Sequence, residues 1–372
     1  MATRDRAASS ARDGVRVLPL VGAPILPMPE HVRLAVAQAM DDPDPRDSRG
    51  LPELRAAIAA ELEREHGLQV DPERRLLITH GAMQGLSLVL RTVLAPGDEI
   101  LVPAPTFFFD GPIRDAGATP VYVPSHERDD WALDLPALEA AVTPRTSALL
   151  LCNPNNPTGH LPDAATLAAV VELAERHGLL VISDDSWQHF TYDGRRYQPV
   201  EALADRWPHL ITVTSLSKYY ALSSWRVGYV LARPSVIDAL QRRFEWEASW
   251  CNVVSQRAAI AALDGPRDWL DASLSTYEAK RDRVCDGIAE SGLAETARPA
   301  AGAFLLVDAS RLGDTPAAIE RALLREGIAA VRGGDMHAPE TYVRLVYGSD
   351  DQVLDELVGG LGRACASIGG RS

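Results

Sequence analysis

The sequence lacks the features that mark metal sites, disulfide frameworks and membrane spans. Its four cysteines stand far apart, with no Cys-x-x-Cys pair and no Cys/His ligand spacing: Cys152, Cys251, Cys285 and Cys365. This spacing argues against a metal or a disulfide framework and favours a reducing cytoplasm. No run of about 18 apolar residues is present, so no segment is expected to span a membrane. The apolar stretch 15–27 contains three prolines and no small-x-small cleavage pattern, which argues against a signal peptide.

Clusters of positive charge are also missing. The chain has 51 Asp and Glu against 37 Lys and Arg, a net charge of −14, and its acidic residues are spread along the sequence. Nucleic acids and anionic membranes attract clustered Lys and Arg, so neither is expected as a main partner. The 372 residues are 46% hydrophobic and 24% charged, which is typical of a globular protein with room for two domains and a large core.

From about residue 50 the chain alternates short apolar runs with helical patterns. Residues 53–64 and 164–178 carry apolar residues at helical spacing. Seven short apolar runs closed by turn residues are strand candidates: 76–79, 99–105, 119–124, 147–152, 179–183, 210–214 and 227–232. Strands that are almost continuously apolar, separated by helices, predict an α/β fold with a mostly parallel sheet covered on both faces.

After about residue 265 the pattern changes. Two helix candidates follow, at 267–291 and 315–326. Two strand candidates lie at 303–309 and 341–347. We therefore predict a large domain over 46–265 and a smaller α+β domain over 266–372. The N-terminal segment 15–45 is expected to join the smaller domain, and residues 1–14 are expected to form a flexible tail.

Small or polar residues follow several strand candidates directly, at the edge where open parallel sheets bind ligands. After the run 76–79 comes His80-Gly81-Ala82-Met83, which opens a helix. Small residues let backbone N–H groups approach an anion, and a helix N-terminus adds partial positive charge. The structural alternative is an ordinary glycine-containing turn between a strand and a helix.

Two further loops at this predicted edge offer a ring and amide groups. Phe107 follows the run 99–105, where an aromatic residue either stacks on a planar ligand or belongs to the core. The run 147–152 is followed by the loop 153–159, NPNNPTG. Its prolines and glycine make it rigid, and its asparagines, Asn156 among them, offer amide donors. A purely structural turn is again the alternative.

Charged residues follow the next two strand candidates. Asp184 and Asp185 come after the run 179–183, where a carboxylate can keep a pyridine nitrogen protonated. A helix cap is the alternative, and we expect one of the pair to have such a structural role. Lys218 comes after the run 210–214. A lysine in a partly dry site can lose its proton and form a Schiff base with an aldehyde cofactor.

Groups suited to anions lie near this lysine and late in the chain. Ser215, Ser217 and Arg226 surround Lys218 in sequence, and hydroxyl and guanidinium groups bind phosphate. Arg344 alternates with apolar residues in YVRLVY, where a buried guanidinium requires a carboxylate partner. That partner is either a substrate or another residue of the protein in a structural salt bridge.

In this order, the segments resemble the class I/II aminotransferases of pyridoxal phosphate (PLP) fold type I. The resemblance runs from about Gly22 to residue 348 and is most specific in NPNNPTG, in SLSKYYALSSWRVGY and in the spacing between them. ISDDSWQHFTYDG, LPELRAAIA, APGDEILVPAPTF and AGAFLLVD also fit the family. The resemblance implies a PLP-dependent aminotransferase that moves the α-amino group of an amino acid to a keto acid. Such enzymes are usually homodimers with active sites at the subunit interface.

The resemblance also implies a role for each candidate residue. Lys218 would carry the internal aldimine and shuttle the α-proton, while Asp184 would pair with the pyridine nitrogen. Phe107 would stack on the ring, Asn156 would hydrogen-bond its O3′ beside the substrate, and Arg344 would bind the substrate α-carboxylate. Gly22 would lie near the same carboxylate. The remaining candidates would hold the phosphate: Gly81, Ala82, Met83, Ser215, Ser217 and Arg226.

Two departures from the family bear on the reaction. Trp187 stands where the family usually has a tyrosine whose phenol contacts O3′, and an indole N–H is only a donor. This cofactor-contacting position would therefore alter the pKa of the aldimine and the fate of the carbanion. The segment 41–47, DDPDPRD, lacks the tyrosine that commonly reaches a neighbouring subunit's phosphate. Its four aspartates suggest a cationic substrate.

Three functions stay open on the sequence alone. The first is an α-amino-acid aminotransferase, because the Lys, Asp and Arg set is complete. The second keeps the cofactor and changes the outcome to elimination, replacement, cyclisation or oxidation of a specialised amino acid, as Trp187 suggests. The third is a non-catalytic PLP-binding module like that of some transcription regulators, which is disfavoured because only about fifteen residues precede the fold. A role for His189 also stays open beside a structural one.

Overall fold

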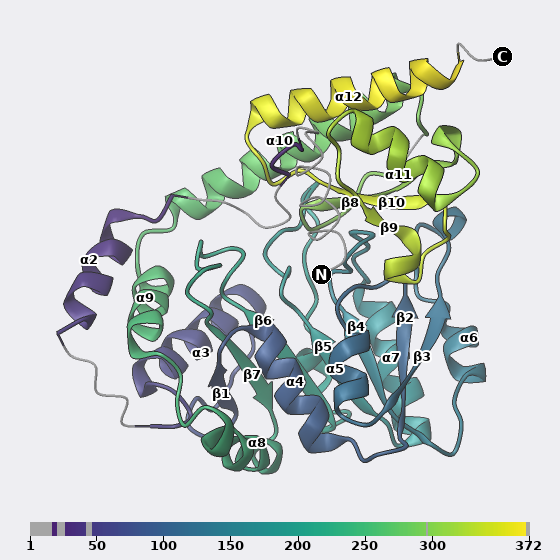
Figure 1. The fold of residues 1–372 in the computed structure, drawn as a ribbon. Coiled ribbons are helices and arrows are strands. Elements are labelled where there is room, and N and C mark those ends of the chain that lie inside the picture. Colours follow the sequence, from purple (N-terminus) through teal and green to yellow (C-terminus); the bar gives the residue numbers. More distant parts are fainter. Residues whose placement is uncertain (1–16, 21–26, 42–46, 295–296, 370–372) are drawn as a thin grey trace.

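A computed structural model describes residues 17–20, 27–41, 47–294 and 297–369 (Figure 1). Its centre is a seven-stranded sheet in the order β1-β7-β6-β5-β4-β2-β3, in which only β7 runs antiparallel to its neighbours. The strands are β1 (Leu76–Thr79), β2 (Glu99–Ala104), β3 (Thr119–Pro124), β4 (Thr146–Cys152), β5 (Leu180–Asp184), β6 (Leu210–Ser215) and β7 (Gly228–Ala232). Each begins and ends within one residue of a strand predicted from the sequence, and the α/β fold with a mostly parallel sheet is confirmed.

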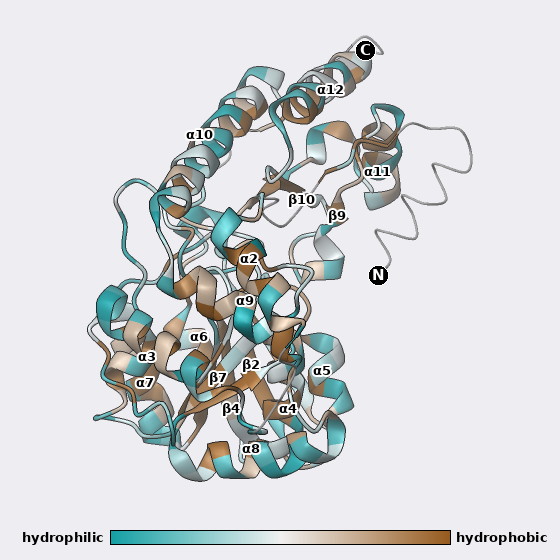
Figure 2. Cartoon of the chain, turned by 90° about the vertical axis from the view of Figure 1, so that its left-hand side faces the viewer, coloured by the Kyte–Doolittle hydropathy of each residue, from teal (hydrophilic) through white to brown (hydrophobic). Residues whose placement is uncertain are grey.

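Helices cover both faces of this sheet because its strands are apolar on both faces. Along β4, Ala148 and Leu150 pack into one core cluster, and Leu149 and Leu151 into another. The helices of this part are α2 (Glu30–Ala39), α3 (Pro52–His66), α4 (Ala82–Val93), α5 (Asp110–Asp115), α6 (Leu135–Ala140), α7 (Ala164–His177), α8 (Pro234–Glu247) and α9 (Val253–Asp264). Figure 2 shows the hydrophobic strands inside and hydrophilic residues on the surrounding helices.

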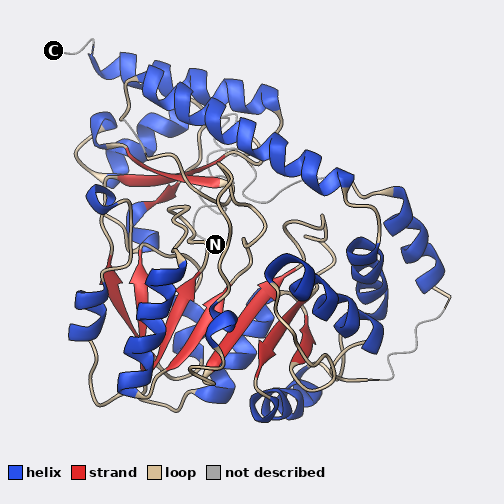
Figure 3. Cartoon of the chain, turned by 180° about the vertical axis from the view of Figure 1, so that it is seen from behind, coloured by secondary structure: helices blue, strands red, loops and turns tan. Residues whose placement is uncertain are grey.

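The C-terminal part forms a second, smaller sheet in the order β8-β10-β9, which is antiparallel throughout. Its elements are α10 (Asp268–Ser291), β8 (Phe304–Asp308), α11 (Pro316–Arg325), β9 (Val331–Arg332), β10 (Tyr342–Val346) and α12 (Asp351–Gly369). Figures 1 and 3 place this sheet and its helices beyond the carboxyl ends of the parallel strands of the large sheet. The space between the two sheets is therefore bordered by the loops predicted to carry the chemistry.

The N-terminal segment contacts both parts of the chain. Leu18 donates its N–H to the carbonyl of Gly327, in the C-terminal part. By contrast, α2 packs against α9, where His31 lies against Gly265. The domain boundaries at 45 and 265 stay a prediction. The predicted flexible tail 1–14 and the candidate Gly22 lie outside the described residues.

Candidate functional site

Backbone and side-chain hydrogen bonds bring the predicted loops to one edge of the large sheet. The N–H of Asn153 donates to the carbonyl of Asp184 at 2.9 Å, which joins the loops after β4 and β5. Asn155 Nδ2 donates to the carbonyl of Pro105 at 3.2 Å, which joins the loops after β4 and β2. The N–H of Thr106 donates to the carbonyl of Met336, in the C-terminal part, at 2.9 Å. These bonds fix the loops relative to one another and to the smaller sheet.

Lys218 follows β6 and points into this junction. Its Nζ lies 5.0 Å from the centre of the Trp187 ring, which is 5% exposed. Burial and, to a smaller extent, the positive charge of Arg226 lower the pKa of Lys218 from 10.5 to about 8, although Asp184 partly opposes both effects. A lysine with such a pKa has an appreciable free-amine fraction near neutral pH and can act as a nucleophile or base.

The two aspartates that follow one another at the end of β5 have different surroundings. Asp184 accepts a hydrogen bond from the N–H of Ser186 at 3.0 Å, and burial raises its pKa. Asp185 is fully buried and accepts hydrogen bonds from the hydroxyls of Ser183 and Tyr197. Burial raises the pKa of Asp185 to about 7 against these bonds. Asp185 therefore has the structural role expected of one of the pair, while the charge of Lys218 acts on Asp184.

The turn after β1 can accommodate an anion because its residue next to Arg226 is Gly81, which has no side chain. Gly81 has a φ of +81°, and a Cβ there would lie 2.6 Å from Nη2 of Arg226. Arg226 Nη1 donates to Oγ of Ser217 at 3.3 Å, and the N–H of Ser217 donates to Oγ of Ser215 at 3.1 Å. A Cβ at Gly228 would lie 3.0 Å from the backbone N of Ala82. Backbone amides, hydroxyls and one guanidinium thus meet in one corner.

Arg344, on β10, reaches this edge from the smaller sheet. Its Nη1 donates to Oδ1 of Asn156 at 2.9 Å, and its guanidinium lies 4.4 Å from the centre of the Phe107 ring. Burial lowers its pKa from 12.5 to about 10. Its buried Nε has no hydrogen-bond partner, and within the described residues no carboxylate acts on its pKa. The structural salt bridge considered above is therefore not formed there.

The structure thus brings most of the described sequence candidates to one edge of the large sheet. Met83 points outward, with 39% of its surface exposed, so only its backbone can serve an anion. His189 stacks on Tyr219 with ring centres 4.4 Å apart, and burial lowers its pKa to about 3, so it stays neutral. Sequence reasoning missed Phe304, whose ring lies edge-on to Trp187 at 4.8 Å and 6.0 Å from the Arg344 guanidinium. Its place at the start of β8 gave no signal beyond core packing.

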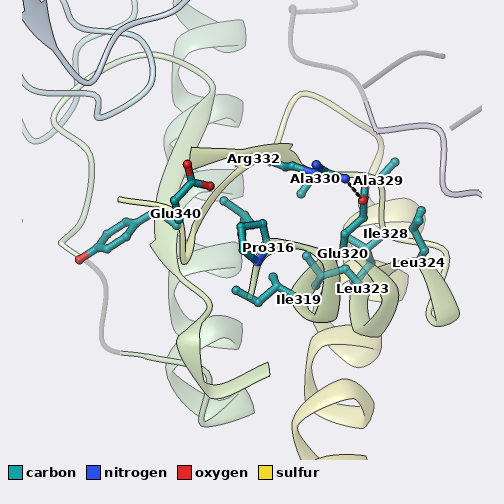
Figure 4. Close-up of a pocket in the computed structure, with 12 residues that line it drawn as sticks. Pro316, Ile319, Glu320, Leu323, Leu324, Ile328, Ala329, Ala330, Arg332 and Glu340 are labelled. Carbon is teal, nitrogen blue, oxygen red and sulfur yellow. Dashed lines mark hydrogen bonds and ion pairs between the residues drawn. The ribbon is translucent and has the colours of Figure 1, made fainter. Parts of the chain in front are cut away.

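A separate pocket lies in the smaller part of the chain, between α11 and the strands β9 and β10 (Figure 4). Apolar side chains such as Ile319 and Leu323 line it beside the ion pair of Arg332 with Glu320. None of the sequence candidates lines this pocket. Within the described residues, no group of three or more His, Cys, Asp or Glu side chains is placed to hold a metal ion. None of the described helices is long and apolar enough to cross a bilayer.

Comparisons with known proteins agree with this geometry. A family model for aminotransferases of class I and II matches residues 26–361. A probable aspartate/prephenate aminotransferase of Thermus aquaticus is 32% identical over 361 residues, which cover 95% of this chain and 93% of that protein. An aromatic-amino-acid aminotransferase of Thermococcus litoralis is 30% identical and covers 90% of this chain and 88% of its own length. The structure of Thermus thermophilus aspartate aminotransferase with maleate superimposes with a TM-score of 0.91 at 30% identity, covering 98% of this chain and 95% of that one.

Proposed function

This chain belongs to the class I and II aminotransferases, and on that premise we propose that Lys218 binds their cofactor, PLP. The chain is thus an enzyme that transfers amino groups, and the family uses PLP. The observation that carries the proposal is that two cations, Arg226 and Arg344, and the carboxylate of Asp184 lie close enough to act on the charge of Lys218. A cofactor with one phosphate and one basic ring nitrogen, joined to an anionic substrate, matches this set of charges.

The residues present fit PLP on grounds that are independent of the comparisons. The turn at Gly81 leaves the space that a Cβ would fill directly against Arg226, which suits a phosphate held by backbone amides and a guanidinium. The raised pKa of Asp184 shows a carboxylate that gains from a nearby positive charge, such as a protonated ring nitrogen. Phe107 would then contact the cofactor ring. Trp187 would also contact this ring, on the side where Lys218 lies.

The reaction divides between the cofactor and this chain's own side chains. Bound PLP supplies an aldehyde that links to an amine and a ring that absorbs the electron pair left at Cα. Arg344 orients the amino acid by its α-carboxylate, which also satisfies the unpaired Nε. Nζ of Lys218, once free, takes the α-proton and can return it, because its pKa near 8 suits both tasks near neutral pH. Asn156 holds Arg344 in place through its Oδ1.

The substrates are an amino acid and a keto acid. Relatives are named for aspartate, prephenate and aromatic amino acids, so we infer that acidic and aromatic amino acids are the first to test. The four aspartates of 41–47 suggested a cationic substrate. Of these, Asp47 is used internally, since its Oδ2 lies 2.9 Å from Nη1 of Arg55. The residues 42–46 lie outside the described part of the chain.

We also propose that the enzyme is a homodimer of the cytoplasm. Three large apolar residues around the start of α4 and the end of α8 are exposed: Met83 by 39%, Trp246 by 92% and Trp250 by 51%. Such residues favour coverage by a second subunit. The four cysteines are free, which suits a reducing compartment. A monomer in light scattering at micromolar concentration would contradict the dimer.

A half-reaction tests the proposed function. The PLP-loaded chain is mixed with aspartate, glutamate, phenylalanine, tyrosine, arginine or lysine, each without a keto acid. We expect one of them to yield its keto acid in an amount equal to the enzyme and to bleach the cofactor's yellow band, and a keto acid to restore that band. Continuous product formation without any keto acid would show that the reaction is not transamination.

A further inference from the structure

The amine of Lys218 has an aromatic ring as a neighbour in addition to the carboxylate of Asp184. Its Nζ lies 5.0 Å from the centre of the Trp187 ring, within the distance at which an ammonium is attracted to an aromatic face. Among aromatic side chains, the indole face attracts cations most strongly. The contact therefore favours the protonated amine and draws Nζ to one place.

The Trp187 ring is fixed by other rings packed against it. Phe304 lies at 4.8 Å with an interplanar angle of 84°, and Phe190 at 5.7 Å with an angle of 68°. Both phenylalanines are 1% exposed, and Trp187 itself is 5% exposed. Edge-to-face packing of this kind sets the ring's orientation. The face that Lys218 meets is thus part of a rigid core rather than a movable surface.

The charged groups that face Lys218 come from three other segments. Arg226 and Arg344 disfavour its protonated form, as burial does, and Asp184 favours it. If Asp184 bonds the cofactor's ring nitrogen, its charge is shared with that nitrogen and stabilises the ammonium less. An aromatic face stabilises the ammonium without adding a second carboxylate, which would repel the substrate's own carboxylate.

We propose that Trp187 is a positioning residue, whose ring face holds Nζ of Lys218 next to the reacting atoms. The inference rests on the proposed function, since it takes Lys218 as the cofactor lysine. It predicts that the ring face supports the protonated lysine in the cofactor-free chain. Capture of PLP requires the free amine, so the pH midpoint of capture reports how strongly the ring holds the ammonium.

The experiment measures the rate of PLP capture by the full-length, cofactor-free chain as a function of pH. Three substitutions are compared with the unmodified protein: Trp187→Leu, Trp187→Phe and, as the matched control, Phe190→Leu. Trp187→Leu removes the face, and we expect its midpoint to fall by on the order of 0.5 to 1 pH unit. Trp187→Phe keeps a weaker face and should fall by less. Phe190→Leu removes one of the two rings packed on Trp187 but keeps the indole and its contact with Phe304, so its midpoint should fall by less than that of Trp187→Leu.

Fluorinated tryptophan provides a second measurement in case the leucine variant does not fold. It keeps the ring's shape and weakens its negative face, so labelling should lower the midpoint of the wild-type chain. The same labelling in Trp187→Phe, which retains the other tryptophans, should leave the midpoint of that variant where it was. An unchanged or higher midpoint in both Trp187→Leu and the labelled wild-type chain would overturn the inference.

Failure of the inference can be told apart from failure of the proposed function. Borohydride reduction followed by peptide mass spectrometry identifies the lysine that captured PLP. If the captured lysine is another one, or no capture occurs, the role of Lys218 is wrong. If Lys218 is the captured lysine and the midpoint does not depend on residue 187, only the role of Trp187 is wrong.

Discussion

Arg281 is buried in the C-terminal part of the chain and Arg344 is half-buried there with a buried Nε, and their surroundings are opposite. Arg281, on α10, is 1% exposed and contacts Asp193 at 2.7 Å and Asp282 at 2.7 Å. Although burial lowers its pKa, the hydrogen bonds that it donates to these carboxylates raise the pKa above the ordinary value. Arg344 has an amide and aromatic rings around it, and burial lowers its pKa to about 10. The scaffold thus pairs Arg281 with carboxylates, whereas Arg344 keeps a buried Nε without a hydrogen-bond partner, as expected for a cation that binds an anionic ligand in the proposed function.

The neighbouring carboxylates of β5 show the same difference. Asp185 is enclosed by the hydroxyls of Ser183 and Tyr197. Asp184 has a backbone N–H and the nearby charge of Lys218. In each pair, one member is satisfied within the protein and the other gains only when a group of opposite charge binds. This contrast separates structural charges from the proposed functional ones better than burial does, because burial acts on the pKa of all four groups.

The largest effect is expected from Lys218→Ala, which removes the residue proposed to bind PLP. Transamination should fall by on the order of 10³-fold or more, because the proposed attachment of PLP and the proposed proton transfer both use this amine. The rate of the half-reaction with the responding amino acid measures the change. Lys280→Ala is the matched control, because Lys280 Nζ donates to the carbonyl of Ser349 at 2.7 Å, away from the site. Equal losses in the two variants would contradict the assignment.

A paired substitution of the two arginines tests the comparison directly. Arg344→Met should lower kcat/KM by about 10²- to 10³-fold, because a charged contact to the substrate carboxylate is lost. Its free energy of unfolding should be unchanged or higher, since a buried cation without a carboxylate partner disappears. Arg281→Met should lower the free energy of unfolding by about 2–4 kcal/mol and leave kcat/KM within about threefold. Urea unfolding and steady-state kinetics on both proteins decide the matter.

The opposite result would break the comparison. If Arg344→Met unfolds easily while its folded fraction stays active, Arg344 is part of the scaffold. Arg344→Lys provides a further check, because it keeps the charge and loses the planar fork. We expect Arg344→Lys to have the free energy of unfolding of the wild type. Its kcat/KM should lie between those of Arg344→Met and the wild type.

The sequence predicted most of the fold because the strands are buried on both faces and therefore read as continuous apolar runs. It did not state that β7 is antiparallel, although only the segment between Ser215 and Gly228 joins β6 to β7. That segment contains no crossover helix, and parallel neighbours need one. The sequence also missed β9, whose two residues are too few for any pattern.

The candidate site was predictable as a set of residue types and not as a set of contacts. Asn156 and Arg344 meet although they lie 188 residues apart, because two different sheets carry them. The face of Trp187 toward Lys218 depends on how Phe190 and Phe304 pack, and no local pattern encodes such packing. Which of two adjacent aspartates turns inward depends likewise on the hydroxyl of Tyr197, beyond the end of β5.

The smallest effect on activity and a clear effect on stability are expected from Asp185→Asn. Burial raises the pKa of Asp185 to about 7 in the folded chain, whereas an aspartate in the unfolded chain has a pKa of about 3.9. The folded state therefore holds this proton more tightly, and the stability that the group contributes is complete below about pH 4 and is lost as pH rises through about 7. Asparagine cannot ionise, so the variant should gain stability relative to the wild type between pH 5 and 8, by up to roughly a few kcal/mol.

Urea unfolding at pH 5, 6, 7 and 8 measures this gain, with Asp163→Asn as the matched control. Asp163 caps α7 by accepting from the N–H of Thr166 at 2.8 Å, and that hydrogen bond lowers its pKa. Its ionisation is therefore complete in both states above pH 5, and its variant should differ from the wild type by the same amount at each pH. A flat difference for Asp185→Asn as well would mean that Asp185 is charged in the folded chain. Asp185 would then be a carboxylate whose charged form is stabilised, as a nearby cation stabilises that of Asp184. The two aspartates would differ only in their hydrogen bonds.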